Sequence, residues 1–520
     1  MSQAYLNSIG DGIIKNSSGY MQTCETIEEF IEICEQDVFH PPPPTIEFIA
    51  FVTTRLSFSF GPLRSIIPPC TDMQRRAILR IVEKQDGKSL LALPPGEGKS
   101  FVACIVSEHY GGDILIMGPV AVLLPWKKEI LKWLKKDAVI IHKIKDIPLL
   151  DPGGNIILAS YGVAKKNSFI LKHNWTTVIC DESHRLKDPY TEQSQVIIPI
   201  VLRARCRLMI SGTPMLKSIS ELYQQILPLV GLKVLGSYTK FIIRYCNAIE
   251  VQGKGRRKWY EIGKDRYTDE IGLLLDQIMI RETSSITVAA ASVAVAASVA
   301  VAAPVAVTAP KKNRYIIKLE NDSGKTIQSI PPGCEEFERN RIIIDNWMLS
   351  GTIKLPLVIE WLKHWLSRNP MKKIAVYAHH RDVLVGLHDA FGSPLSALVY
   401  GDTKSEERQR IFDSLASNDN LPRIGILSYG CSSLGITLCP GTYNVAFAEL
   451  LFDSAGMEQS ENKVFRYGVT HDVNCYWMIC NKTSDDMMLG TIQKKTNNTS
   501  VVIDNKRRRL IFDRLVNLID

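Results

Sequence analysis

Residues 91–101 read LALPPGEGKSF, and this stretch decides the fold. Leu90 to Leu93 form an apolar run directly before the glycines, as a buried strand entering a turn does. Gly96 and Gly98 let backbone N–H groups converge on an anion, and residues 99–110 (KSFVACIVSEHY) predict a helix whose N-terminus favours negative charge. The stretch therefore predicts a strand, a glycine turn and a helix, in the order found in phosphate-binding loops.

The end of the stretch matches the Walker pattern G-x-x-x-x-G-K-[ST]. Lys99 would reach the β- and γ-phosphates of a nucleotide, and the Ser100 hydroxyl would hold Mg²⁺. The first glycine of the pattern would stand where the chain has Leu93. An ordinary strand–turn–helix is therefore an open alternative, and a nucleotide site needs a second motif.

The second motif lies in residues 175–188, WTTVICDESHRLKD. Thr177 to Cys180 form an apolar strand, so Asp181 and Glu182 stand at its carboxyl end, where a parallel sheet displays catalytic groups. Asp181 would hold Mg²⁺, and Glu182 would polarise the attacking water. A solvated acidic turn is the alternative. An offset of about 80 residues from the loop suits two strands of one nucleotide-binding sheet.

Composition is that of an ordinary globular protein. The 520 residues are 45% hydrophobic and 22% charged, with a net charge of +8 that permits a polyanionic partner without requiring one. Twelve cysteines without a C-x-x-C pair indicate a reducing compartment and neither a disulfide framework nor a zinc module. We expect Cys475 and Cys480 to be core residues. Residues 1–19 lack the apolar segment of a signal peptide.

Strand-like runs alternate with helical stretches in both halves of the chain, which predicts an α/β fold with two parallel-sheet lobes. The expected domains are an N-terminal segment over 1–60 ending in a Pro-rich break, a nucleotide-binding lobe over 61–283, a low-complexity Ala/Val linker over 284–312, a second lobe over 313–490 and a basic tail over 491–520.

The Ala/Val segment at residues 286–310 has the length of a membrane span. Against a span, alanine contributes little insertion energy, Pro304 interrupts the segment, and no aromatic belt flanks it. We interpret it as an inserted, soluble linker.

The motifs together resemble one family. Asp181-Glu182-Ser183-His184 matches a D-E-S-H box, and further matching stretches are SGTP, ELYQQI, RYCNA, AHHRDVL, FAEL and TSDDMMLGTIQKK. Over residues 61–495 the chain resembles the Swi/Snf-type DNA-dependent ATPases of helicase superfamily two, and among them the HARP-type annealing helicases. The resemblance implies two tandem RecA-like lobes with an ATP cleft between them, ATP and Mg²⁺ as cofactors, and DNA as partner.

The resemblance also implies residue roles in the first lobe. The adenine edge would be read by Gln74. The phosphate, Mg²⁺ and water-activating positions correspond to Lys99, Ser100, Asp181 and Glu182. The groups that couple the nucleotide state to strand contacts correspond to His184, Ser211 and Thr213.

In the second lobe, a motif near the cleft corresponds to Gly435 and Thr437. The last motif corresponds to Gln459, Lys463 and Arg466. Arg466 would reach across the cleft to the γ-phosphate, which makes hydrolysis depend on lobe closure.

Two departures from the family pattern affect the expected activity. Pro94 and Pro95 stand where the family has acidic residues and a methionine, and they remove backbone donors before the glycines. Lys463 replaces the first of two arginines, and it keeps the charge but loses the planar fork. We expect an active but slow motor.

DNA contact is predicted from composition. Residues 253–266, GKGRRKWYEIGKDR, combine six basic residues with Trp259 and Tyr260, which suits phosphates and exposed bases; a solvated hairpin is the alternative. NKRRRLIFDR, residues 505–514, would be a nuclear address, a DNA-binding tail or a charged helix face.

Three functions agree with these observations: a translocase that rewinds or remodels branched DNA, a chromatin-remodelling engine of the same fold, and an inactive DNA-binding scaffold. Each places the protein in the nucleus or another DNA-containing compartment, with DNA as a partner bound with little sequence preference and no membrane.

Overall fold

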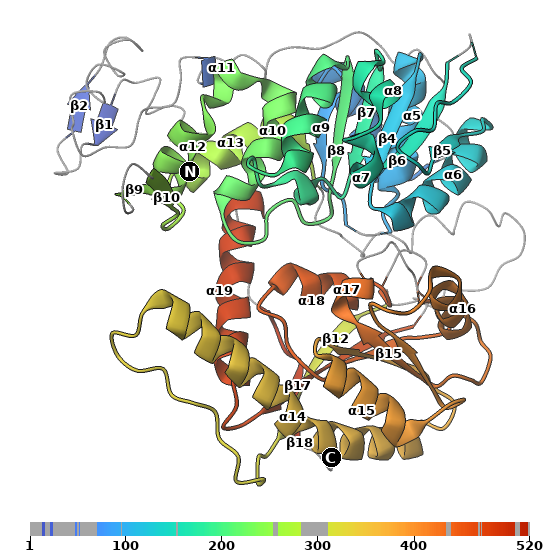
Figure 1. Ribbon diagram of the computed structural model, residues 1–520, viewed down its shortest axis with the longest axis vertical. Coiled ribbons are helices and arrows are strands. Elements are labelled where there is room, and N and C mark those ends of the chain that lie inside the picture. Colours follow the sequence, from blue (N-terminus) through green and yellow to red (C-terminus); the bar gives the residue numbers. More distant parts are fainter. Residues whose placement is uncertain are drawn as a thin grey trace, which may run out of the picture. The chain divides into compact units, whose positions relative to one another are not determined.

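The computed structural model describes residues 13–15, 21–23, 47–48, 51, 70–94, 96–151, 154–252, 258–281, 310–432, 438–465, 469, 471–504 and 510–517. The chain divides into two compact units, with residues 98–282 in the first and residues 283–497 in the second. Each unit contains one seven-stranded sheet (Figure 1).

The first sheet has the strand order β11-β3-β8-β7-β4-β6-β5, and every neighbouring pair is parallel. Its strands are β3 (Lys88–Leu91), β4 (Ile114–Gly118), β5 (Val139–Ile141), β6 (Ile156–Ser160), β7 (Thr177–Asp181), β8 (Cys206–Ile210) and β11 (Met279–Ile280).

Helices connect these strands (Figure 1). They are α4 (Asp72–Leu79), η2 (Arg80–Lys84), α5 (Lys99–Tyr110), α6 (Val120–Leu134), α7 (Tyr161–Ala164), α8 (Ser168–Lys172), η3 (Ser183–Leu186), α9 (Glu192–Arg203), η4 (Ile219–Leu222), α10 (Tyr223–Val230), α11 (Leu232–Leu235), α12 (Tyr238–Cys246) and α13 (Thr268–Ile278).

Burial explains why these strands form a parallel sheet. Every residue of β4 and β6 is buried, so both faces of the sheet are covered. A parallel sheet covered on both faces requires continuous apolar strands rather than alternating ones. Two apolar clusters flank the sheet: one contains Leu115 and Val178, and the other contains Ile116 and Ile179.

The second sheet is also parallel throughout, with the order β14-β15-β13-β16-β17-β12-β18. Its strands are β12 (Lys312–Leu319), β13 (Ile374–Ala378), β14 (Ser396–Val399), β15 (Ile424–Ser428), β16 (Asn444–Phe447), β17 (Val473–Cys480) and β18 (Arg514–Asn517). Its helices are α14 (Glu336–Arg368), α15 (Arg381–Phe391), α16 (Ser405–Ala416), α17 (Tyr429–Ser432), α18 (Ser454–Glu461) and α19 (Asp485–Asp504).

Helix α14 is long and apolar enough to cross a membrane by length and composition. Trp361 and Leu362 lie in the apolar core of the second unit, however. Lys354, in the middle of the helix, forms a buried ion pair with Asp485, with 2.8 Å between Nζ and Oδ2. These contacts are those of a core helix.

Two short antiparallel ribbons lie outside the large sheets. One pairs β1 (Ile13–Lys15) with β2 (Met21–Thr23), and the other pairs β9 (Ile249–Gln252) with β10 (Lys258–Glu261). Strand β10 lies in the basic segment at residues 253–266, of which residues 253–257 lie outside the described residues.

The predicted fold class, two tandem RecA-like parallel-sheet lobes, is confirmed. Helix α5 has the predicted bounds, whereas strand β3 ends at Leu91 instead of continuing to Leu93. Cys475 and Cys480 are buried in the core, as expected. Beyond position 490, the chain continues as helix α19 and returns to the sheet as β18, while residues 505–509 and the linker at 286–309 lie outside the described residues.

Candidate nucleotide site

The glycine loop between β3 and α5 depends on two left-handed residues. Gly96 has φ of +87° and Gly98 has φ of +79°, a region that side chains other than glycine rarely adopt. A Cβ on Gly98 would lie 2.3 Å from Nε2 of Gln74. The left-handed backbone therefore favours glycine at 98, and a larger residue would also displace the amide of Gln74.

Gln74 is held over the loop by the start of helix α4. Thr71 Oγ1 accepts from the Gln74 N–H at 3.2 Å, and Gln74 Oε1 accepts from the Thr71 N–H at 3.1 Å. This reciprocal capping box fixes the side chain and leaves Nε2 directed toward Gly98. The predicted adenine-reading residue thus lies at the predicted phosphate loop.

Lys99 and Ser100 are the first two residues of helix α5. Lys99 Nζ donates to the carbonyl oxygens of Leu93 at 2.8 Å and Pro94 at 3.2 Å, so the ammonium lies across its own loop. Since the first N–H groups of a helix have no partner within the helix, this end of α5 favours an anion.

Asp181 lies at the carboxyl end of β7, as predicted. Its Oδ2 accepts from Trp126 Nε1 at 2.8 Å, and its Oδ1 accepts from the backbone N–H of Glu182 at 2.9 Å. Burial, reinforced by the Glu182 carboxylate, raises the pKa of Asp181 to about 6, although Trp126 and Lys99 oppose the change. The carboxylate is therefore oriented and placed in the electrostatic field of the loop lysine.

Glu182 has a strained backbone. Its φ is +51°, which costs a residue with a Cβ on the order of 1–2 kcal/mol. This conformation ends the strand abruptly and starts η3, and Oε2 then lies 3.4 Å from Nδ1 of His184. Strain of this kind concentrates at functional sites.

The three residues predicted to couple nucleotide and DNA are in contact. His184 Nδ1 lies 2.9 Å from Ser211 Oγ, and the same hydroxyl accepts from the Thr213 N–H at 3.2 Å. Since His184 also faces Glu182, one chain of polar contacts joins the end of β7 to the turn that follows β8.

A second buried connection runs parallel to the first. Ser183 Oγ donates to Gln225 Oε1 at 2.8 Å, and Gln225 Nε2 donates to the carbonyl oxygen of Pro214. Glu221 binds the N–H groups of residues 216 and 217 and pairs with Lys187 at 2.6 Å. The two turns are thus joined at several points.

In the second unit, the structure describes only two of the five predicted site residues. Gln459 is half-buried on α18, and Lys463 is 5% exposed in the turn after that helix. Glu461 fixes this turn, because it is fully buried and accepts two hydrogen bonds from Arg314, at 2.8 and 2.6 Å. The predicted positions Gly435, Thr437 and Arg466 lie outside the described residues.

Sequence reasoning missed three residues that support the site. Trp126 orients Asp181, Tyr161 donates its hydroxyl to the Asp181 carbonyl oxygen at 2.8 Å, and Gln225 joins Ser183 to Pro214. Trp126 and Gln225 are buried residues of helices α6 and α10. The helical spacing of the sequence explains their burial, so it gave no sign of a role in a site. Only Tyr161, directly after a strand, had a position that indicated a role.

The residues at the glycine loop and at the end of β7 fit a nucleotide with a bound Mg²⁺ ion. Mg²⁺ prefers oxygen ligands such as the Ser100 hydroxyl and the Asp181 carboxylate. The glycine loop supplies backbone donors where a Cβ at 98 would not fit, and Lys99 supplies a cation. A glycine nest, an ammonium and a single ordered carboxylate form a suitable site for a triphosphate with its metal ion.

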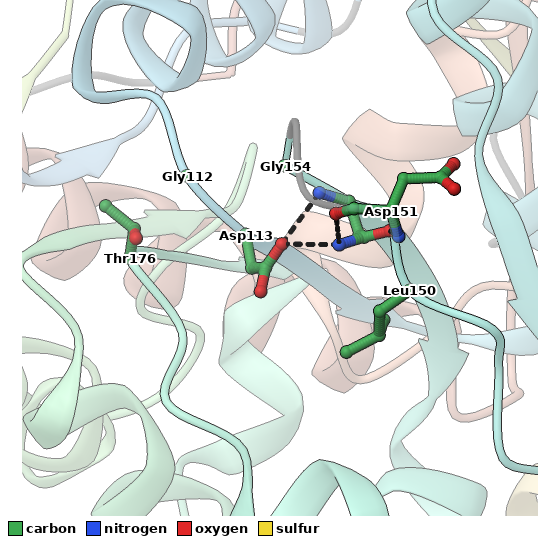
Figure 2. Close-up of a pocket in the computed structure, with 7 residues that line it drawn as sticks. Gly112, Asp113, Leu150, Asp151, Gly154 and Thr176 are labelled. Atoms are coloured by element: carbon green, nitrogen blue, oxygen red, sulfur yellow. Dashed lines mark hydrogen bonds between the residues drawn. The ribbon is translucent and has the colours of Figure 1, made fainter.

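A hollow in the first unit lies away from these residues. It has about 570 Å³ and is lined by Gly112, Asp113, Leu150, Asp151, Gly154, Asn155 and Thr176 (Figure 2). These residues precede strands β4, β6 and β7, so the hollow lies at the edge of the sheet opposite Asp181. Burial alone would raise the pKa of Asp113, but hydrogen bonds from Asn155 and His173 lower it, so this carboxylate serves the loop structure.

Comparison with known proteins identifies similar sequences. A family model described as SNF2-related domain matches residues 15–328, more than half of the chain. The SWI/SNF-related matrix-associated actin-dependent regulator of chromatin subfamily A-like protein 1 homolog of Caenorhabditis elegans is 27% identical over 83% of this chain and 61% of its own length. The DNA annealing helicase and endonuclease ZRANB3 of Mus musculus is 26% identical over 90% of this chain and 44% of its own length.

The chain therefore spans about half the length of these relatives. Among solved structures, the Sulfolobus solfataricus SWI2/SNF2 ATPase core in complex with dsDNA aligns with 82% of this chain and 92% of its own, at 17% identity and a TM-score of 0.38. The fold assignment rests on the strand order of the two sheets rather than on this alignment.

Proposed function

The chain belongs to the SNF2-related family, and from that membership we propose that it is an ATP-driven, DNA-dependent translocase that rewinds or remodels branched duplex DNA. The observation that carries the proposal is the placement of a glycine loop, an ordered aspartate and a strained glutamate at one edge of the first sheet. The ATPase activity, the DNA substrate and the location in the nucleus or another DNA-containing compartment all belong to this proposal.

Each residue of the first unit has a proposed task. Gln74 reads the adenine edge, Lys99 neutralises the β- and γ-phosphates, and Ser100 and Asp181 hold Mg²⁺. When bound, Mg²⁺ neutralises the charge that develops on the phosphates. Glu182 polarises the attacking water and accepts its proton, and its left-handed backbone conformation places the carboxylate just beyond β7.

ATP hydrolysis is proposed to be coupled to DNA contacts through the polar side chains that follow Glu182. His184 contacts both Glu182 and Ser211, so a change in the charge or position of Glu182 is transmitted to the turn at 211–214. The buried Ser183–Gln225 contact joins the two turns at a further point. The roles of Gly435, Thr437, Gln459, Lys463 and Arg466 in the second half of the chain are proposed from the family pattern alone.

DNA would be gripped mainly through its phosphates. Such a grip has little sequence preference and weakens steeply with salt, because binding releases condensed counterions. Stimulation of ATPase activity by forked or duplex DNA should therefore fall as salt rises.

The test measures ATP hydrolysis by the purified chain alone and with single-stranded, duplex and forked DNA or nucleosomes. Lys99→Ala should lose nucleotide binding, and Glu182→Gln should bind ATP but stall hydrolysis, whereas the surface variant Glu192→Gln should match wild type. Unchanged turnover in Glu182→Gln would overturn the assignment of the base.

The same assay separates the other two candidate functions. A preference for nucleosomes over naked forks would indicate a chromatin-remodelling engine. Absence of hydrolysis with every DNA would indicate an inactive scaffold, the function that the prolines at 94 and 95 and Lys463 would favour. Robust unwinding of a long blunt duplex would contradict a rewinding translocase.

A further inference from the structure

One tryptophan of this chain faces solvent. All eight tryptophans lie within the described residues, and only Trp259 is exposed, at 47% of its surface. It belongs to strand β10 of the hairpin, where it pairs with Val251 of β9. An exposed indole on a two-stranded ribbon contributes nothing to a core, so its position calls for a function other than packing.

The two faces of the ribbon carry different side chains, and most of them are exposed on both faces. Cross-strand partners share a face, so Trp259 and Val251 lie on the same side as Ile249, which is 64% exposed. Tyr260 lies on the opposite side, packs against the core of the first unit and donates its hydroxyl to Glu250 at 3.1 Å. The indole thereby forms a small exposed platform with Val251 and Ile249, and Glu261 on the same face accepts from Trp259 Nε1 at 3.4 Å.

The base of the ribbon is fixed to the rest of the unit beside α12 (Figure 1). The Gly263 N–H donates to the Cys246 carbonyl oxygen at 2.9 Å, and a Cβ on Gly263 would lie 2.8 Å from the carbonyl oxygen of Asn247. Asp265 accepts from Ser218 Oγ at 2.8 Å and from the backbone N–H of residue 219 at 3.1 Å. Ser218 lies four residues after the turn at 211–214. The segment that anchors the ribbon therefore follows directly after the turn in which Ser211 contacts His184.

Charged side chains of both signs flank the platform among the described residues. Lys258 pairs with Glu250, whereas Lys264 and Arg266, which follow β10, are exposed cations. Alternation of cations with an exposed aromatic ring suits a nucleic acid, because the cations bind phosphates and the ring stacks on a base.

We infer that the outward face of the β9–β10 ribbon, centred on Trp259, binds an unpaired nucleobase of single-stranded or branched DNA by stacking. A base inside a duplex already has neighbours on both faces, so a free π-face is available only where strands separate. Lys264 and Arg266 then hold the phosphates beside that base. This inference rests on the proposed function and gives it a structural basis for distinguishing a branch from a continuous duplex.

The experiment compares wild type, Trp259→Ala, Trp259→Phe and the control Phe337→Ala, which removes an exposed aromatic ring from the second unit. Affinity for labelled single-stranded, forked and blunt duplex DNA is measured by fluorescence anisotropy on the full chain. Since base stacking contributes about 1–3 kcal/mol, Trp259→Ala should weaken single-strand and fork binding by about five- to hundredfold, and duplex binding by less than about twofold. Trp259→Phe should keep most of the affinity.

Tryptophan fluorescence gives a second readout. Stacking on thymine bases should quench a part of the emission that is missing in Trp259→Ala. The inference would be overturned if wild type and Trp259→Ala bound forked DNA with equal affinity, or if the variant lost as much affinity for blunt duplex as for forked DNA. Either result could occur while wild type still showed DNA-stimulated hydrolysis. Absence of DNA-stimulated hydrolysis in wild type would instead contradict the proposed function.

Discussion

Replacement of Trp126 by phenylalanine tests whether the ordered carboxylate of Asp181 is the metal ligand. The substitution keeps an aromatic ring in a position that is 2% exposed but removes the indole N–H that donates to Asp181 Oδ2 at 2.8 Å. Because this hydrogen bond favours the ionised form, its loss should raise the pKa of Asp181 above its present value of about 6.

The magnitude follows from the charge on the acceptor. A hydrogen bond to a charged group contributes about 1.5–3 kcal/mol, and about 1.4 kcal/mol corresponds to a tenfold change in the proton equilibrium. The pKa of Asp181 should therefore rise to about 7–8. At pH 7 the ionised fraction would fall from about nine-tenths to between about one-half and one-tenth, so binding of Mg²⁺ should weaken by about two- to tenfold.

The assay is the pH dependence of kcat/KM for DNA-stimulated hydrolysis, which reports groups of the free enzyme. Since Mg²⁺ requires the carboxylate, kcat/KM should fall as the pH decreases through about 6 in wild type and through about 7–8 in Trp126→Phe. Activity of the variant should recover at pH 9.

The matched control is Trp133→Phe on the same helix. Trp133 Nε1 donates to Glu129 Oε2 at 2.6 Å, so the control also removes an indole N–H bound to a carboxylate, but at a distance from Asp181. The melting temperatures of both variants show how much stability is lost because phenylalanine is smaller than tryptophan. If the profile of Trp126→Phe superposes on that of Trp133→Phe, the assignment of Asp181 is refuted.

Further predictions concern the loop, the last motif, the second core and the linker. Gly98→Ala should reduce nucleotide affinity by about tenfold in a fluorescent-nucleotide titration, because a Cβ is strained at φ of +79° and would displace the Gln74 amide. Lys463→Arg should raise turnover by restoring a planar fork, and equal turnover of Lys463→Ala and wild type would exclude the residue from chemistry. Lys354→Ala should lower the free energy of unfolding by about 3–5 kcal/mol in denaturant titration, because it leaves the buried carboxylate of Asp485 without its cation. Replacing residues 288–307 with a Gly/Ser segment of equal length should leave DNA-stimulated hydrolysis within a few-fold of wild type, and abolished activity in folded protein would show that the linker is more than a tether.

Local signals in the sequence were sufficient for the main elements of the first unit and for the positions of the candidate residues at their ends. Helix α5 follows from the position of its glycines and its apolar spacing, and Asp181 follows from its place after a continuous apolar strand. Such signals depend on φ, on hydrophobic period and on the edge at which a parallel strand ends, all of which are encoded within a few neighbouring residues.

The partners of those residues were decided by tertiary structure. Asp181 and Trp126 are 55 positions apart, and His184 and Ser211 are 27 apart. The indole reaches the carboxylate only because α6 packs on the sheet with that side inward, and amphipathic spacing predicts burial without specifying a polar contact. The outward direction of Trp259 also depends on the strand register, since a slip of one residue would turn the indole to the opposite face. The sequence determined which residues stand at strand ends and turns, whereas packing of distant elements determined which side chains meet, because direction in space is a property of the assembled chain.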